Sequence, residues 1–311
     1  MANTVASVRN YGTHNSSQNM LIKITDMMKK HLITFFATLI ISSLPLIAFA
    51  EELEIVNRPV NTSGLTGLLV TTSPYCVSPG TVEVAASILY ENSVTPEFST
   101  TEYPLSVTVG MPHNSELGLR GSYFELKEGP TATAVSARKA GDLQLSYKWN
   151  FLPQTESSII PAVSMIVAGV VPTERSSDPK INTVDHWGFA VGLSAGSEIE
   201  WSDHILALYA DAQIKGRDPD EKRLRDFWEV VNAGLLFPIS KYRNLQILVE
   251  YTIVRGRDRI TIEGGDYSAA TYGLRLLSER FNLTIGTQIL RKRTEGFDNS
   301  GRIFGLMSVK L

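Results

Sequence analysis

Regular alternation of apolar and polar residues is the feature that most constrains the fold of this chain. In residues 142–151, DLQLSYKWNF, every second residue is apolar and every residue between is polar. Side chains of a β-strand point alternately to opposite faces, so this segment predicts a half-buried strand. Alone, the pattern allows a soluble sandwich with its apolar face on a core, or a transmembrane barrel with its apolar face in lipid and its polar face around a lumen.

About twelve segments of this kind recur from Thr81 to the C-terminal end, with lengths typical of membrane-spanning strands. No segment has the pattern of a long amphipathic helix. The expected strands are 81–91, 103–111, 115–126, 142–152, 158–170, 186–199, 204–215, 226–238, 244–255, 267–278, 281–291 and 301–311.

The connections between the expected strands alternate between short and long. MPHN (111–114) and LPQTES (152–157) are short, whereas KEGPTATAVSARKAG (127–141) and PTERSSDPKINTVD (172–185) are long and polar. Outer-membrane barrels have short periplasmic turns and long extracellular loops. The sequence therefore favours an all-β, transmembrane, antiparallel up-and-down barrel, although a soluble periplasmic β-protein remains the alternative.

The region before the first strand has the anatomy of a secreted precursor. Residues 28–50 contain Lys29 and Lys30, an apolar stretch and the small-residue signal Ala48-Phe49-Ala50, which together predict a signal peptide. We expect residues 1–27 to be a spurious extension, with the true start at Met27 or Met28. Residues 51–80 are then a periplasmic or lumenal lead-in segment, and residues 81–311 form the barrel in the outer membrane of a Gram-negative bacterium.

Composition excludes several classes of protein. The formal net charge of -3 gives no reason to expect a nucleic-acid partner. A single cysteine, Cys76, excludes an internal disulfide. No apolar run of helix-spanning length follows the signal peptide. We find no Cys/His metal cluster, phosphate-binding loop or Ser-His arrangement for a hydrolase, so we expect no metal, no cofactor and no enzyme activity.

The tryptophans fall near expected strand ends, where barrels carry girdles of aromatic residues at both lipid–water interfaces. Trp149 and Trp201 fall near periplasmic ends, and Trp187 and Trp228 fall near extracellular ends. Aromatic residues also end strands of soluble proteins, so the agreement supports the barrel without deciding it.

Ionisable residues on the expected polar faces are candidates for the lining of a lumen. They form either a selectivity constriction of mixed charge or a set that only stiffens the barrel. Glu250 and Arg275 lie on neighbouring strands and are expected to pair. The selectivity candidates are Arg120, Lys148, Asp211, Glu250 and Arg275.

Arginines cluster at the expected extracellular ends of the strands. Arg255, Arg257, Arg291 and Arg293 are candidates for contact with lipopolysaccharide phosphates, which arginine binds well, or else form a solvated charged rim. The expected partners are thus outer-membrane lipid, lipopolysaccharide and, during biogenesis, the barrel-assembly machinery.

Several stretches resemble known outer-membrane proteins. GDLQLSYKW (141–149), GTVEVAASILYEN (80–92) and ELGLRGSYF (116–124) resemble barrels of the type described as transporters of the MetA-pathway of phenol degradation. SGLTGLLVTTSPYCVSPGT (63–81) resembles the lead-in of YjbH-like outer-membrane proteins of exopolysaccharide systems. The first resemblance implies a barrel that passes small, often hydrophobic molecules, and it carries no catalytic residues.

The functional prediction is a channel or transporter for small molecules, with hydrophobic or aromatic compounds among the candidate solutes. The alternative is a structural or loop-mediated interaction barrel associated with the envelope or with exopolysaccharide. An outer-membrane hydrolase is the least favoured interpretation, because none of the three mature-chain histidines, His113, His186 and His204, has a recognisable catalytic setting.

Overall fold

A computed structural model describes the residues 56, 58–93, 98–128, 135–155, 160–173, 187–201, 204–217, 227–239, 244–256, 266–292 and 300–311. The expected signal peptide and the N-terminal extension lie outside these residues. Within the described part of the chain, no helix is long and apolar enough to cross a membrane.

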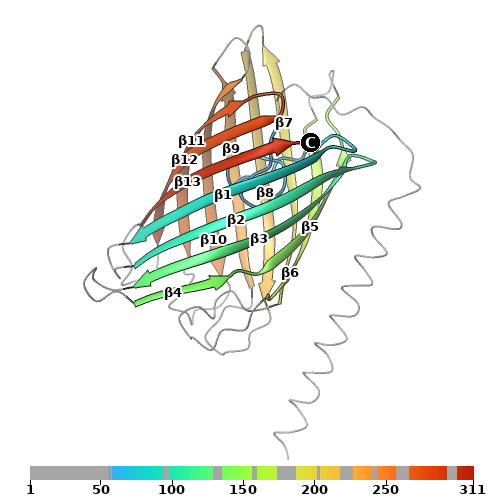
Figure 1. Cartoon of the computed structure of the whole chain (residues 1–311). Coiled ribbons are helices and arrows are strands. Elements are labelled where there is room, and N and C mark those ends of the chain that lie inside the picture. Colours follow the sequence, from blue (N-terminus) through green and yellow to red (C-terminus); the bar gives the residue numbers. More distant parts are fainter. Residues whose placement is uncertain are drawn as a thin grey trace, which may run out of the picture. The chain divides into compact units, whose positions relative to one another are not determined.

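Every regular element in the described residues is a β-strand, as the alternating pattern predicts (Figure 1). The strands are β1 (Val82–Ser93), β2 (Phe98–Met111), β3 (Ser115–Glu128), β4 (Val135–Ala140), β5 (Leu143–Leu152), β6 (Ala162–Val171), β7 (Gly188–Trp201), β8 (His204–Arg217), β9 (Phe227–Pro238), β10 (Leu245–Gly256), β11 (Tyr267–Leu277), β12 (Phe281–Lys292) and β13 (Ser300–Lys310).

The strands form one closed antiparallel sheet. Neighbours in sequence pair in order, and β1 also pairs with β13, so that the two ends of the barrel sequence meet. β3 pairs with β5 along its periplasmic half and with β4 along its other half. Because β4 and β5 occupy successive stretches of one position in the wall, the thirteen strands make a barrel of twelve. The molecule is therefore a transmembrane up-and-down β-barrel, which confirms the predicted fold class.

The expected strand boundaries agree with the structure within a few residues at most positions, and two differ more. β2 begins at Phe98 rather than at 103, so it runs further toward the extracellular side. β4 lies within a stretch, 127–141, that the sequence suggests is a loop. Its sequence, VSARKA, is too short and too polar to show the alternation of a spanning strand.

The two faces of the sheet invert the pattern of a soluble protein. Large apolar residues on the outer face are exposed, including Ile303 with 59% and Leu193 with 54% of their surface accessible. Polar and charged residues on the inner face, including Lys148 and Arg275, are fully buried. An apolar exterior around a polar interior is the arrangement that a bilayer requires of a barrel.

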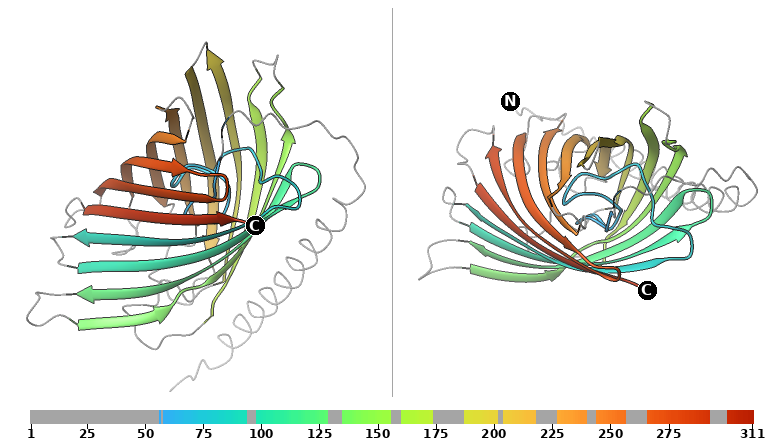
Figure 2. Two further views of the ribbon diagram at one scale, coloured as in Figure 1. Left: turned by 45° about the horizontal axis from the view of Figure 1, so that its top comes forward. Right: turned by 90° about the horizontal axis from the view of Figure 1, so that it is seen from above.

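The interior of the barrel is occupied by the segment that precedes β1. Seen from above in Figure 2, residues 58–77 form a compact loop inside the ring of strands. We call this segment the plug. Most of its apolar side chains are buried, with Val60, Leu68 and Leu69 at 0% exposure, while Val70 is partly buried. Of the two positions expected for the lead-in segment, the structure has the lumenal one.

Candidate functional site

The plug holds its own shape through hydrogen bonds that begin and end within it. Six backbone hydrogen bonds close inside the plug, among them those from Asn61 N to Leu65 O and from Ser73 N to Thr66 O. The Asn61 side chain accepts a bond from Ser63 N at 2.9 Å and lies within 3.3 Å of Thr72 Oγ1. Asn suits such a position because its short amide can replace backbone partners in a turn. The plug is therefore a small folded unit rather than an extended strand.

Glu250 of β10 binds three consecutive amides of the plug. Its Oε1 accepts from Leu69 N at 2.9 Å, and its Oε2 accepts from Val70 N at 3.0 Å and from Thr71 N at 2.6 Å. Hydrogen bonds to an ionised acceptor are roughly twice as strong as neutral ones. A carboxylate in the middle of β10 thus fixes the tip of the plug.

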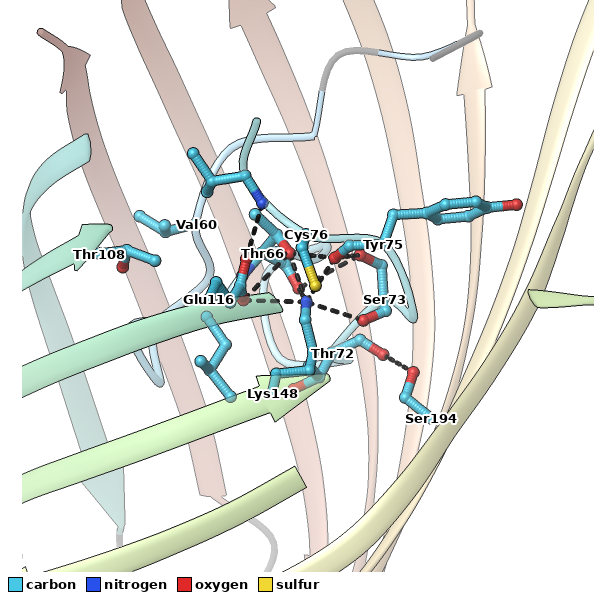
Figure 3. A network of polar contacts seen from close by, with 12 residues as sticks. Val60, Thr66, Thr72, Ser73, Tyr75, Cys76, Thr108, Glu116, Lys148 and Ser194 are labelled. Atoms are coloured by element: carbon cyan, nitrogen blue, oxygen red, sulfur yellow. Dashed lines mark hydrogen bonds and ion pairs between the residues drawn. The ribbon is translucent and has the colours of Figure 1, made fainter. Parts of the chain in front are cut away.

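Lys148 of β5 and Glu116 of β3 form a second attachment, drawn in Figure 3. Lys148 Nζ lies 2.9 Å from Glu116 Oε1, and both side chains are fully buried. The ammonium also donates to Ser73 O at 3.0 Å, to Tyr75 O at 2.5 Å and to Thr66 Oγ1. Because this ion pair has several further partners, its charges are compensated although both groups are buried.

The carboxylate of Glu116 also accepts hydrogen bonds from backbone amides of the plug. Glu116 Oε1 accepts from Thr66 N, and Oε2 accepts from Val77 N, each at 2.9 Å. Near it, Cys76 Sγ donates to the Asn114 carbonyl oxygen at 3.1 Å, in the turn between β2 and β3. This attachment therefore holds both the middle and the end of the plug near the periplasmic rim.

Strands β7 and β8 supply the third attachment. Asp211 Oδ2 accepts from Thr72 N at 2.8 Å, and Ser194 Oγ donates to Thr72 O at 2.6 Å. Asp211 is itself held by Asn232 Nδ2 at 3.0 Å and by Gln213 Nε2 at 2.9 Å. One plug residue is thus bound at both its amide and its carbonyl.

Two arginines bind carbonyl oxygens of the plug. Arg275 Nη2 donates to Gly67 O at 3.1 Å and to Leu68 O at 2.7 Å. Arg120 Nε donates to Thr62 O at 2.9 Å, while its Nη2 pairs with Glu102. Acidic wall residues therefore bind plug amides, and basic wall residues bind plug carbonyls.

Apolar contacts complete the seat of the plug. Leu68 and Leu69 belong to a buried cluster that includes Leu236, Leu248 and Phe304 of the wall. Glycines on the inner wall make room for them. A Cβ at Gly286 would lie 2.5 Å from Leu69 Cδ1, and one at Gly234 would overlap Leu68 Cδ1. A larger residue at either wall position would require the leucine side chain or the wall strand to shift.

The plug connects to β1 through the short exposed sequence Ser78-Pro79-Gly80. Gly80 has φ of +83°, a value that favours glycine, and nothing lies within 4 Å of a Cβ placed there. The bend is thus open on the side where a Cβ would lie, unlike the buried plug that precedes it.

The five selectivity candidates all lie on the lumenal side, and each contacts the plug. The contacts come from Arg120, Lys148, Asp211, Glu250 and Arg275. The expected pairing of Glu250 with Arg275 takes another form. In the register Glu250 faces Thr271 and Arg275 faces Gln246, and both charged groups bind neighbouring parts of the plug. Their role in selectivity stays a prediction.

Those aromatic and arginine candidates that the structure describes lie near the strand ends. Trp149 is exposed and packs on Phe151, with ring centroids 5.8 Å apart, and Trp187 directly precedes β7. The side chain of Trp201 lies outside the described residues. Arg255 and Arg291 are exposed near the extracellular ends of β10 and β12, whereas Arg257 and Arg293 fall outside the described part of the chain.

Trp228 differs from its expected place in the outer girdle. It shares the parity of Val230 and Asn232, and Asn232 binds the lumenal Asp211. Trp228 therefore lies on the lumenal side of β9, and the exposed Phe227 takes the outward position, 6.1 Å from Phe189 between ring centroids. The prediction for Trp228 was wrong because closeness to a strand end does not fix the face.

The plug contacts are the part of the site that the sequence reasoning missed. A signal for them was present, because residues 59–82 contain no Asp, Glu, Lys or Arg, whereas the expected inner wall carries many. An uncharged segment can offer charged wall residues only its main chain and its neutral side chains. At the start of the plug, by contrast, Glu198 of β7 binds a charged side chain, that of Arg58, at 3.0 Å.

The closed sheet, the apolar exterior and the polar lumen that holds the plug (Figure 2) define an outer-membrane type of β-barrel. Comparison with solved structures places the chain beside proteins of this class. An outer membrane channel from Pseudomonas putida F1 matches with a TM-score of 0.59 at 10% identity, over 76% of this chain and 97% of that one. The NanC porin matches with a TM-score of 0.50 at 13% identity, over 73% and 100% of the two chains.

These likenesses establish the fold, because the identities are too low to carry function across. No family model and no curated protein matches the chain.

Proposed function

We propose that this chain is an outer-membrane channel for small molecules and that its own plug closes the lumen. The observation that carries the proposal is a twelve-stranded wall whose inner face is polar and whose lumen holds a compact segment with backbone hydrogen bonds of its own (Figure 2). Twelve strands enclose more space than the side chains of a small barrel can fill and less than the open lumen of a large porin. Such a barrel needs a movable segment if solutes are to pass.

The solute class follows from the sequence resemblance. Barrels of the phenol-degradation type, which stretches of this chain resemble, suggest small hydrophobic or aromatic compounds as cargo. In the unplugged barrel, Arg120, Lys148, Asp211, Glu250 and Arg275 would line the passage and set its preference for ions. The same side chains would thus hold the plug in one state and face the solute in the other.

Conductance in planar bilayers tests this proposal. The matched proteins are the wild type and the double variant Leu68→Asp/Leu69→Asp, in which two carboxylates replace the apolar contacts of the plug and leave the wall unchanged. We expect larger conductance steps from the variant, and we expect Glu250→Ala to shift ion selectivity. A variant whose plug has left its seat, as judged by the reactivity of Cys76, but which conducts no better than the wild type, would exclude a channel.

A second candidate function rests on Arg255 and Arg291. Both are exposed near extracellular strand ends, as contact with lipopolysaccharide phosphates requires. We propose that they anchor the barrel in the outer leaflet. Replacing both with Gln should weaken lipopolysaccharide binding and its dependence on salt, and unchanged binding at low salt would exclude this role.

A further inference from the structure

The contacts between wall and plug are made mainly to the main chain of the plug. Glu250, Asp211 and Glu116 together accept hydrogen bonds from six plug amides, those of Thr66, Leu69, Val70, Thr71, Thr72 and Val77. The amide is common to every residue except proline. These bonds therefore recognise the peptide backbone and do not depend on which side chains the peptide carries.

The basic wall residues bind the carbonyl oxygens of the plug backbone. Arg275 takes the carbonyls of Gly67 and Leu68, and Lys148 takes those of Ser73 and Tyr75. The acceptors Glu250 and Asp211 and the donors Arg275 and Lys148 thus lie on four different strands, and groups that bind amides and groups that bind carbonyls follow one another along the peptide. The arrangement is that of a receptor for a peptide main chain.

A buried segment must satisfy its backbone groups in any case, so the kind of partner is informative. The plug already closes six backbone bonds within itself, and the wall could supply neutral hydroxyls and amides for the rest. It supplies hydroxyls to Gly64 O and Thr72 O, from Thr108 and Ser194, but carboxylate, ammonium and guanidinium groups make most of the other contacts. Ionised side chains bind a peptide strongly, and water also solvates them well when the peptide is absent. A wall of this composition is stable with the lumen occupied by peptide or by water.

We propose that the inner wall is a binding site for a peptide main chain, that the plug is its tethered occupant, and that peptides are a solute class that the unplugged barrel binds. This inference rests on the proposed channel, since a free peptide must enter the lumen. It goes further in naming a ligand class that the sequence resemblance does not suggest.

The test uses the full chain with an unseated plug, the variant Leu68→Asp/Leu69→Asp. Cys76 is the single cysteine of the chain, so its labelling rate reports whether the plug has left its seat. Heat-modifiable gel migration shows that the barrel is folded. The probe is a labelled synthetic peptide of residues 58–77 carrying Cys76→Ser, and its binding to the variant in detergent is followed by fluorescence anisotropy.

Two peptide analogues test whether the wall recognises the main chain of the peptide. In the first, ester linkages replace the amides of Val70 and Thr71, which removes two N–H donors to Glu250 and keeps the shape. We expect it to bind roughly 10- to 100-fold more weakly, the range for losing charge-assisted hydrogen bonds. In the second, Ala or Ser replaces every side chain except those of Arg58, Leu68, Leu69 and Tyr75, which contact the wall through their side chains. This peptide should bind within about tenfold of the parent, because the receptor reads few side chains.

Wall variants complete the test. Glu250→Gln, made in the unseated background, should weaken the parent peptide and remove most of the difference between amide and ester. Glu91→Gln is the matched control, because Glu91 pairs with Arg302 near the other end of the lumen, at 2.6 Å, and should leave binding unchanged.

Equal binding of the ester and the amide, or loss of binding on exchange of the side chains, would overturn the receptor proposal. Neither result depends on conductance. If the peptide binds but the barrel does not conduct, only the proposed channel is contradicted. If the barrel conducts but binds the ester and the amide equally well, only the proposed receptor is contradicted.

Discussion

At the scale of single residues, the lumen shows why charged side chains can be buried in this barrel. Lys148 and Glu116 are both at 0% side-chain exposure, yet each finds several partners in the plug as well as the other charge. Removing one member of a buried ion pair costs more than removing both, because it leaves one charge uncompensated. The pair therefore makes a sharp test of the plugged state.

We predict that Lys148→Met lowers the free energy of unfolding by about 3–5 kcal/mol, since Glu116 is left without its counter-charge. The double variant Lys148→Met/Glu116→Gln should recover a large part of this loss. Urea-dependent unfolding in detergent micelles, followed by heat-modifiable migration, measures both. Equal losses in the single and double variants would mean that water reaches Glu116 and that the pair is not dry.

Glu250 leads to a second prediction at this scale. Glu250→Ala removes the acceptor of three plug amides, so the plug should leave its seat more often and Cys76 should react with a thiol reagent at least about tenfold faster. The control is again Glu91→Gln, which should leave the rate unchanged. If the two variants label equally fast, Glu250 does not hold the plug.

The residue scale also marks the limit of the sequence reasoning. Alternation is enough to assign Arg120, Lys148, Asp211, Glu250 and Arg275 to the inner face, because period 2 fixes the face of every residue in a strand. It contains no information about what those residues bind. Their partner is a segment more than forty residues away in sequence that has no period of its own, and only the folded chain brings the two together.

At the scale of elements, the plug and the wall have complementary shapes. Wall glycines lie where plug leucines approach, so a methyl group at Gly234 would displace Leu68. Strands are easily recognised in the sequence because they alternate. The plug is hard to recognise in the sequence because its residues 58–77 fold by turns and have no regular period. β4 is also hard to recognise, because it is only six residues long.

Gly234→Ala is therefore predicted to raise the reactivity of Cys76 by pushing Leu68 out of its site. Adding Leu68→Ala should restore slow labelling in part, because the shorter side chain frees the space that the methyl group takes. Gly301→Ala is the matched control, since nothing lies within 4 Å of a Cβ at that position. Failure of the second substitution to restore slow labelling would show that Gly234 acts through the wall strand and not through the plug.

At the scale of the whole molecule, the lipid-facing surface decides which solvent the barrel is built for. Ile285 lies near the middle of β12, points outward and is 55% exposed, whereas Leu276 lies near the periplasmic end of β11 and is 47% exposed. In water both positions would tolerate arginine equally well. In a bilayer, an arginine at the midplane of the lipid face costs about 2–4 kcal/mol and one near the interface costs about 0–1 kcal/mol.

We therefore predict that Ile285→Arg lowers the free energy of unfolding in lipid vesicles by about 2–4 kcal/mol and that Leu276→Arg lowers it by at most about 1 kcal/mol. The difference arises because a charge at mid-depth must leave water, while one near the rim can reach the headgroups. Reversible unfolding of vesicle-inserted protein, followed by tryptophan fluorescence, measures both. Equal, small effects would mean that β12 does not face hydrocarbon, and the inverted arrangement of faces would then need another explanation than a membrane.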